Sequence, residues 1–169
     1  AKPHGSDVRL IVGLGNPGAE YEGTRHNVGF DVLDAVAGRW RLEFQSAPAD
    51  ALVARTYPVG GGKAVLLAKP LTFMNLSGRA VGALLHYYRL ETPDLLVVTE
   101  DVHLPLGRIR ARRQGSSGGH NGLGSVIEVL GTNRFSRFRI GVGRGDPRRR
   151  LSGRVLSRFG PDERPVIDE

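Results

Sequence analysis

The chain has 169 residues, of which 40% are hydrophobic and 24% charged, a composition typical of one ordered globular domain. The absence of cysteine excludes disulfides and thiolate metal sites and favours a cytoplasmic protein. No apolar stretch approaches the ~20 residues of a membrane span, and no signal segment opens the sequence. The formal net charge of +7 predicts a polyanionic partner, most often a nucleic acid.

Short apolar segments predict strands, and longer segments with helical periodicity predict helices. The expected strands are Arg9–Val12, Leu52–Tyr57, Lys63–Ala68, Leu95–Thr99, Gly107–Arg112 and Arg137–Val142, and the expected helices are Asn27–Arg39, Ser77–Tyr88 and Leu123–Leu130. Gly60-Gly61-Gly62 joins the second and third strands as a hairpin. The alternation predicts an α/β fold: a single-domain three-layer sandwich over residues 1–169, with a mixed, largely parallel twisted sheet flanked by helices.

The two ends of the chain depart from this pattern. Ala1 to Ser6 precede the first strand without periodicity and are expected to be a cloning remnant or disordered. The tail from Pro147 is basic and rich in Arg, Gly and Pro, and a short helix is expected after Asp162.

His26 is the most informative single residue. It follows the glycine-rich turn Gly13–Gly18 by eight residues and precedes Asn27, which can cap the next helix. A position just before a helix N-terminus disfavours the imidazolium, and a neutral imidazole is what a general base requires. The alternative is a turn histidine that bonds local backbone.

Polar and aromatic residues follow several predicted strands. Asn16 follows the first strand, Phe73 to Asn75 follow the hairpin, and Glu100 and Asp101 follow the strand Leu95–Thr99. Ligands of open α/β sheets bind outside the carboxyl ends of the strands, so these motifs are expected to share one crevice. Tyr21 and Phe73 could each hold a base, a ribose or a side chain, although Phe73 fits the core equally well.

Two glycine-rich runs match familiar motifs only superficially. Gly13–Gly18 fits the dinucleotide fingerprint, but Pro17 removes one amide and the helix begins too late to face a pyrophosphate. Gly115–Gly119 fits the nucleophile elbow, but arginines rather than a buried strand precede it, and the only later histidine is His120. Its free amides suit an anion or a close backbone approach. The histidines show no metal-ligand spacing, so no metal site is expected.

Arginines cluster in two regions. Arg108, Arg110 and Arg112 alternate with apolar residues, so one face of a strand carries a row of guanidinium groups. The second region contains Arg134, Arg137, Arg139, Arg144 and Arg148–Arg150. Together they could track a phosphate backbone; the alternative is a solvated strand face.

Four segments together resemble bacterial peptidyl-tRNA hydrolases. They are Leu10–Phe30, Lys69–Gly78, Gly115–Ser125 and Phe135–Arg144, and they follow the family's order and spacing over nearly the whole chain. The family cleaves the ester that joins a peptide to the terminal ribose of tRNA, and it uses no metal or cofactor. The resemblance therefore implies a monomeric cytoplasmic hydrolase that acts on peptidyl-tRNA and has no membrane partner.

The resemblance also implies roles for individual residues. His26 would activate water, and Asn16 would sense whether the nitrogen of the amino acid is blocked. The residues implied in substrate or tRNA binding are Tyr21, Phe73, Asn75, Asn121, Arg110, Arg112 and Arg139. An ester needs only a positioned water and a base, which agrees with this set. The alternative for Asn75 and Asn121 is that they cap helices.

The sequence departs from the family at the acidic residue that orients the histidine. The spacing from Leu104 and Pro105 puts Glu100 at the aspartate position, with Asp101 beside it, and His103 takes a second acidic position. Which carboxylate orients His26 stays open. The chain also ends early for the family, so the helical cover of the cleft is expected to be reduced. A non-catalytic RNA-binding domain is the second hypothesis, and a nucleotide-dependent enzyme is the third.

Overall fold

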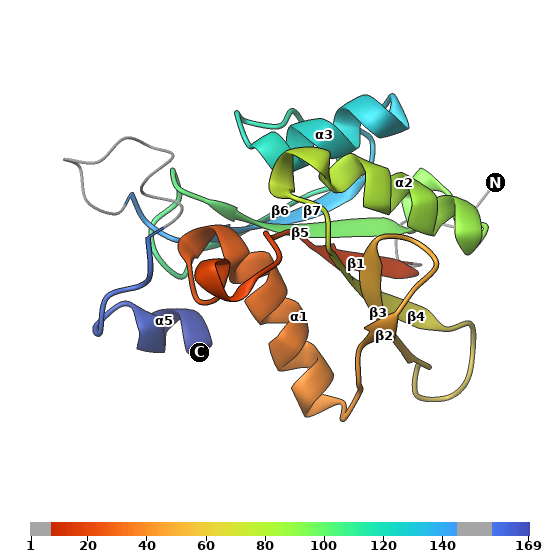
Figure 1. The fold of residues 1–169 in the computed structure, drawn as a ribbon, viewed down its shortest axis with the longest axis horizontal. Helices are drawn as coiled ribbons and strands as arrows, with labels where there is room; N and C mark the ends of the chain where they lie inside the picture. Colours follow the sequence, from red (N-terminus) through yellow and green to blue (C-terminus); the bar gives the residue numbers. More distant parts are fainter. Residues whose placement is uncertain (1–7, 145–156) are drawn as a thin grey trace.

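The fold is one mixed sheet of seven strands, seen in a computed structural model that describes residues 8–144 and 157–169 (Figure 1). The strands are β1 (Leu10–Gly13), β2 (Gln45–Ser46), β3 (Ala51–Thr56), β4 (Val65–Pro70), β5 (Leu95–Asp101), β6 (Ile109–Arg112) and β7 (Ser136–Gly141). Their order across the sheet is β2-β3-β4-β1-β5-β7-β6. The four central strands, β4, β1, β5 and β7, run parallel, and the pairs toward each edge are antiparallel.

Helices cover both faces of the sheet and make three layers (Figure 1). The helices are α1 (Val28–Arg39), α2 (Ser77–Tyr87), α3 (Asn121–Leu130) and the short α5 (Arg164–Asp168). The apolar side chains of α2 and α3 share one core cluster with the central strands, whereas those of α1 pack against the other face. Among the described residues, no helix is long and apolar enough to cross a membrane.

Short 3-10 turns connect the sheet to the helices at the edge where the site lies. They are η1 (Ala19–Tyr21), η2 (Arg25–Asn27) and η3 (Met74–Leu76). A further 3-10 turn, η4 (Thr92–Asp94), directly precedes β5 and lies at the opposite end of the strands. Because β1, β4 and β5 are parallel, the loops that follow them emerge at one edge of the sheet. The turn η2 leads directly into α1, and η3 leads directly into α2.

The glycines after β1 serve close packing between the strand and α1. A Cβ atom on Gly13 would lie 2.2 Å from the carbonyl oxygen of Gly29, and one on Gly15 would lie 2.9 Å from the ring of Phe30. Close packing against α1 therefore explains the glycines at these two positions without a bound pyrophosphate. The contacts give no support to a nucleotide site at Gly13–Gly18.

The predicted elements agree with the structure, and each of the six predicted strands and three helices ends within two residues of its expected position. The β3–β4 hairpin and the short helix after Asp162 are confirmed. The two-residue edge strand β2 was not predicted, because its residues are exposed and carry no apolar pattern. The expectations for Ala1 to Ser6 and for much of the tail from Pro147 lie outside the described residues.

Candidate active site

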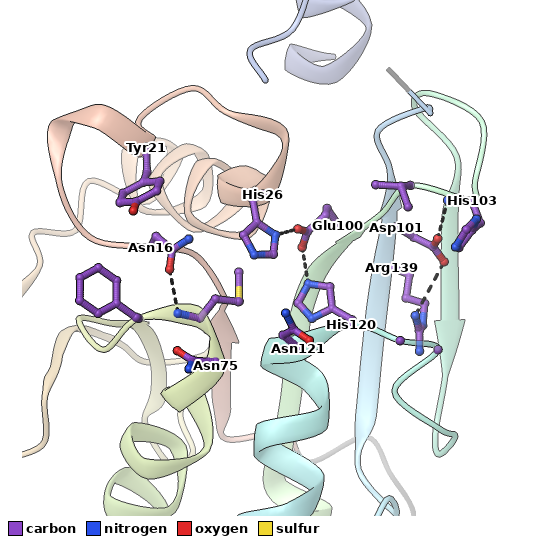
Figure 2. Close-up of a pocket in the computed structure, with 15 residues that line it drawn as sticks. Asn16, Tyr21, His26, Asn75, Glu100, Asp101, His103, His120, Asn121 and Arg139 are labelled. Carbon is purple, nitrogen blue, oxygen red and sulfur yellow. Dashed lines mark hydrogen bonds and ion pairs between the residues drawn. The ribbon is translucent and has the colours of Figure 1, made fainter. Parts of the chain in front are cut away.

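A cleft of about 630 Å³ lies at the edge of the sheet where β1 and β5 end (Figure 2). It is lined by Asn16, Tyr21, His26, Phe73, Met74, Asn75, Glu100, Asp101, Val102, His103, Gly118, Gly119, His120, Asn121 and Arg139. The expected crevice therefore exists, and it gathers every predicted site residue except Arg110 and Arg112.

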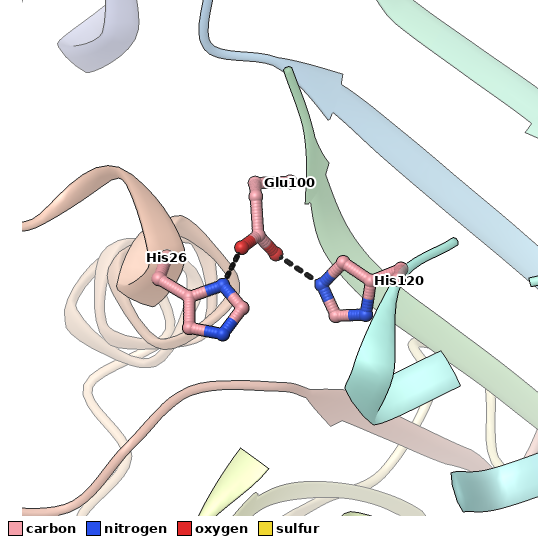
Figure 3. Close-up of side chains that lie close together, drawn as sticks. All are labelled: His26, Glu100 and His120. Atoms are coloured by element: carbon pink, nitrogen blue, oxygen red, sulfur yellow. Dashed lines mark hydrogen bonds and ion pairs between the residues drawn. The ribbon is translucent and has the colours of Figure 1, made fainter. Parts of the chain in front are cut away.

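His26 and Glu100 form a hydrogen-bonded pair at the centre of the cleft (Figure 3). Nδ1 of the imidazole contacts Oε2 of the carboxylate. His26 is carried by η2, whereas Glu100 is a buried residue near the end of β5. The other ring nitrogen, Nε2, lies on the side of the ring away from Glu100 (Figure 3). A carboxylate at Nδ1 fixes the tautomer that leaves Nε2 unprotonated and able to accept a proton.

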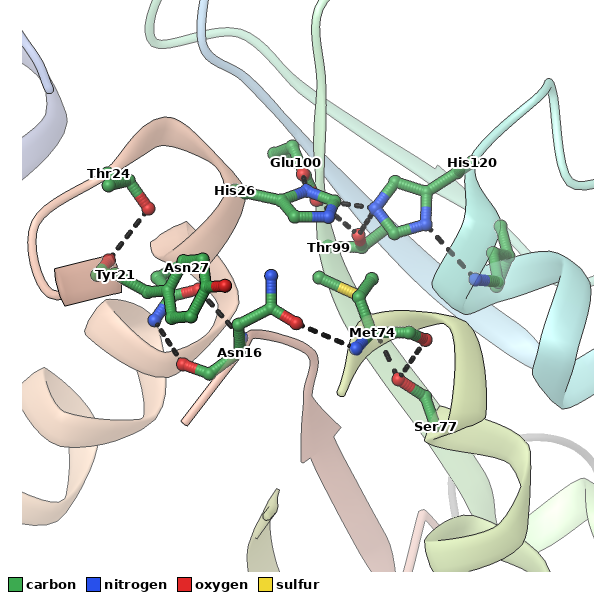
Figure 4. Close-up of polar contacts among 11 residues, drawn as sticks. Asn16, Tyr21, Thr24, His26, Asn27, Met74, Ser77, Thr99, Glu100 and His120 are labelled. Atoms are coloured by element: carbon green, nitrogen blue, oxygen red, sulfur yellow. Dashed lines mark hydrogen bonds and ion pairs between the residues drawn. The ribbon is translucent and has the colours of Figure 1, made fainter. Parts of the chain in front are cut away.

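The second oxygen of Glu100 is held by His120 and Thr99 (Figure 4). Oε1 lies 2.5 Å from Nε2 of His120 and accepts a hydrogen bond of 2.8 Å from the Thr99 hydroxyl. Nδ1 of His120 accepts the backbone N–H of Leu123 at 3.0 Å, so the proton of this ring is on Nε2, facing the carboxylate. Glu100 is thus a buried carboxylate with donors at both oxygens.

Both histidines are held neutral. Burial, reinforced by the nearby His120, lowers the pKa of His26 to about 3. Burial and the charge of Arg139 lower the pKa of His120 to about 4, against the opposing effect of Asp101. The expected neutral imidazole at residue 26 is therefore confirmed in direction, but the cause is burial beside a second histidine.

Asn27 does not cap α1 as the sequence analysis expected. Its side chain instead bonds both backbone polar groups of Asn16: Oδ1 accepts the N–H and Nδ2 donates to the carbonyl, each at 2.8 Å. The Asn16 side chain accepts the backbone N–H of Met74 at 2.7 Å through Oδ1 (Figure 4). Because an N–H requires an oxygen acceptor, Nδ2 of Asn16 is the amide group left for a ligand in the cleft.

The remaining aromatic and amide residues line the walls and rim of the cleft. Phe73 is 56% exposed, so its assignment to the core is wrong. Asn75 lies in η3, and no side chain caps α2. Asn121 is the first residue of α3, whose capping side chain is His120. Both asparagines are exposed and neither caps a helix, so the capping alternative is wrong for each.

Asp101 lies toward one end of the cleft, beside His103 and Arg139 and beyond Glu100 as seen from His26 (Figure 2). Its Oδ1 accepts the backbone N–H of His103 at 2.8 Å, and its Oδ2 lies 3.8 Å from a guanidinium nitrogen of Arg139. Of the two adjacent carboxylates, the one in contact with His26 is therefore that of Glu100.

Among the described arginines of the two clusters, Arg137 is buried, Arg139 is half-buried and the others are exposed. Arg110 and Arg112 are exposed on the edge strand β6, where they pair with Arg139 and Arg137 of β7. Arg137 is 1% exposed and donates to the backbone carbonyls of residues 115, 116, 133 and 135. The inclusion of Arg137 among phosphate-tracking residues was therefore wrong, because its guanidinium holds loops in place.

The Gly115–Gly119 loop presents its backbone carbonyls to arginines. Gly115 and Ser116 accept from Arg137, and Ser116 also accepts from Arg139 at 2.8 Å. A Cβ atom on Gly118 would lie 3.0 Å from the Arg139 guanidinium. The glycines here permit a close approach, as one of the two interpretations expected.

The fold brings together three possible metal ligands that are far apart in the sequence, so the spacing of the histidines did not predict this cluster. One ligand atom each from His26, Glu100 and His120 lies within 4.8 Å of the others. The hydrogen bond from Leu123 to Nδ1 of His120 places the ring proton on Nε2, where a metal would need a lone pair. The donor set therefore suits a hydrogen-bonded network better than a metal ion.

The sequence did not predict three residues that hold the site in place. Thr99 and His120 bind the Glu100 carboxylate, and Asn27 binds the backbone of Asn16. His120 is adjacent to Asn121 in a segment that carried the family resemblance, which is the one signal that could have identified it. Thr99 is a completely buried strand residue with no local sequence signal.

Comparisons with known proteins agree with the resemblance. A family model described as peptidyl-tRNA hydrolase matches residues 10–169. The chain is 51% identical to a peptidyl-tRNA hydrolase of Halalkalibacterium halodurans, over 96% of this chain and 86% of that protein. It is 47% identical to the Bacillus subtilis protein of the same name, over 95% and 84%. Its fold matches a crystal structure of Acinetobacter baumannii peptidyl-tRNA hydrolase with a TM-score of 0.89 at 35% identity, over 99% of this chain and 84% of that one.

Proposed function

This chain belongs to the peptidyl-tRNA hydrolase family, and we propose that His26 is the general base with which it hydrolyses the ester of peptidyl-tRNA. The hydrogen bond between His26 and Glu100 is the observation that carries this proposal. It leaves Nε2 of a neutral imidazole free to accept a proton in the cleft.

The reaction needs one water and one base, because an ester is already activated. Nε2 of His26 takes a proton from water as its oxygen attacks the ester carbonyl carbon. The tetrahedral intermediate then collapses, the bond to the ribose oxygen breaks, and the imidazolium returns the proton to that oxygen. Glu100 stabilises the transient imidazolium through Nδ1–H. The products are a free peptide acid and tRNA with its terminal hydroxyl restored.

Asn16 would select substrates whose amino group is acylated. Since Oδ1 is occupied by Met74, the group offered to a ligand is the Nδ2 donor. A peptide carbonyl can accept from Nδ2, whereas the ammonium of an unblocked aminoacyl-tRNA brings donors and positive charge and finds no acceptor there. The clamp from Asn27 fixes the backbone of this residue.

The other residues of the cleft would hold the two parts of the substrate. Asn75 and Asn121 offer amide groups to the peptide, the terminal nucleotide or the developing oxyanion. Tyr21 and Phe73 offer flat surfaces beside them. The exposed Arg110 and Arg112, with Arg139, would contact the phosphate backbone of the tRNA.

We further propose that the protein acts as a monomer without a metal or cofactor. One chain supplies every residue of the cleft, so the proposed chemistry needs no second copy. Because ribosomes supply peptidyl-tRNA, the cytoplasm is the compartment where we expect this substrate to be met.

Release of the acyl group from N-acetyl-aminoacyl-tRNA, compared with the unblocked aminoacyl-tRNA, tests the proposed function. We expect rapid release from the blocked substrate only. Tight binding of tRNA without release would favour the RNA-binding domain instead. Equal rates on both substrates would contradict the role of Asn16 and leave that of His26 intact.

A further inference from the structure

Arg25, the residue before His26, is buried and almost fully hydrogen-bonded. Its side chain donates to the carbonyl of Val142 at 2.5 Å and to the Ser157 hydroxyl at 3.0 Å. The remaining donors meet Glu163, whose two carboxylate oxygens lie 2.7 and 3.2 Å from the guanidinium nitrogens. Only 4% of Arg25 is exposed, so this arginine does not serve as a surface contact for tRNA.

The segment 157–169 wraps the turn that carries His26. The backbone N–H of Arg25 donates to the carbonyl of Ser157 at 2.9 Å, and Thr24 forms an antiparallel bridge with Arg158. The guanidinium of Arg25 lies 5.0 Å from the ring centroid of Phe159. Contacts between residues 132 to 138 positions apart in sequence therefore hold this three-residue turn in place.

Arg25 also ties the turn to the strand that carries Glu100. Val142, whose carbonyl accepts from Arg25, donates its own N–H to the carbonyl of Asp101 at 3.2 Å. Asp101 follows Glu100 on β5, and Glu100 binds His26. A closed ring of contacts thus joins residues 25 and 26 to the end of β5. Glu163 lies outside this ring and holds the guanidinium of Arg25, which is one of its members.

We propose that Arg25 and Glu163 are positioning residues, which hold His26 in register with Glu100 and the cleft. This inference depends on the proposed role of His26 as the base. The turn η2 has no side-chain cap of its own, so external contacts must set its position. The hydrogen bond from Arg25 lowers the pKa of Glu163, which keeps this carboxylate charged at neutral pH. Displacement of a catalytic group by about 1 Å can cost on the order of 10²-fold in rate.

The test compares Glu163→Gln with Asp168→Asn in the otherwise intact protein. Asp168 is a matched control, because it also pairs with an arginine of this segment, Arg164, but does not contact residues 24–26. We expect Glu163→Gln to lower kcat on N-acetyl-aminoacyl-tRNA by about tenfold, within the cost of a displaced catalytic group, with KM within about twofold. Glu163→Asp keeps the charge and should recover part of kcat, and Asp168→Asn should match wild type.

A second arm separates positioning from a general loss of structure. In a His26→Ala background the positioned group is absent, so we expect Glu163→Gln to have no further effect on the residual rate. All variants are assayed at a temperature at which urea unfolding shows each to be folded. An unchanged kcat in Glu163→Gln, or an equal loss in both backgrounds, would overturn the inference. Full activity of His26→Ala alone would instead contradict the proposed base.

Discussion

Nδ1 of His26 and Oε2 of Glu100 meet across 74 residues of sequence. The resemblance to the family places an aspartate at this position, and the longer glutamate side chain still reaches the imidazole. Thr99 and His120 hold the other carboxylate oxygen. The His26–Glu100 contact supports the proposal that Glu100 orients His26, as the aspartate of the family resemblance would.

Removal of the charge at residue 100 should slow catalysis. Glu100→Gln loses the acceptor that faces Nδ1–H of His26 and the stabilisation of the imidazolium, so we expect kcat to fall at least tenfold with a smaller effect on KM. Asp101→Asn should be milder, because Asp101 contacts His103 and Arg139 rather than His26. Steady-state release of N-acetyl-amino acid from tRNA measures both.

Glu100→Asp is the informative companion variant. It restores the residue that the family resemblance implies, and it should retain activity if His26 and His120 can both follow the shorter side chain. A silent Glu100→Gln together with an inactive Asp101→Asn would assign the orienting role to Asp101.

His26→Ala should reduce turnover to a small residual rate and leave tRNA binding nearly unchanged. General-base assistance contributes roughly 10²–10⁴-fold. Among residues 8–144 and 157–169, the only other imidazole in contact with Glu100 is that of His120, which uses both ring nitrogens in hydrogen bonds. Single-turnover hydrolysis and a filter-binding assay with deacylated tRNA separate the two effects. Wild-type turnover in this variant would refute the assignment.

The sequence predicted the sheet and its helices well because their signals are local. The apolar runs of β1 and β5 and the periodicity of α2 follow directly from burial in a three-layer fold. The strand β2 and the 3-10 turns were missed, because two or three residues carry no periodicity.

The chemistry of the site depends on tertiary contacts, and these explain the incorrect expectations. Asn27 stands where a capping residue belongs, but the backbone of Asn16 competes for its amide. Arg137 belongs to an arginine-rich run, but four carbonyls surround it in the fold. His120 is too far along the chain from Glu100 for any local spacing to link them.

The pH dependence of kcat/KM should have no acid limb near the ordinary pKa of histidine. Burial lowers the pKa of His26 from 6.5 to about 3, and the neutral ring is the active form. Lowering the pH from 8 to 5 therefore leaves the base unprotonated, and activity should fall only below this range. Initial rates between pH 4.5 and 8, corrected for spontaneous ester hydrolysis, test this. A break between pH 6 and 7 that disappears in His26→Ala would contradict it.

Activity should survive an excess of EDTA. The ring proton of His120 faces Glu100, so the His26–Glu100–His120 cluster lacks the lone pairs that a divalent metal needs. The assays with and without EDTA contain the same concentration of monovalent salt. This control is needed because EDTA also removes divalent cations from the tRNA, whose folding depends on them. Loss of activity that stoichiometric zinc restores, with the tRNA prefolded separately, would show that the cluster is a metal site.

The arginines of β6 should contribute to tRNA affinity through phosphate contacts. Arg110→Ala and Arg112→Ala are each expected to weaken binding and to reduce the slope of log K against log salt by ~0.7–0.9, the value for one phosphate contact. Both side chains are exposed beside the cleft strand β7, so neither change should disturb the core. Arg39→Ala, at the exposed C-terminal end of α1, removes the same charge on another part of the surface and serves as the control. Binding isotherms at several salt concentrations should show the lower slope only for the β6 variants. An unchanged slope in both would assign these arginines to a solvated edge, and an equal change in Arg39→Ala would indicate a response to net charge alone.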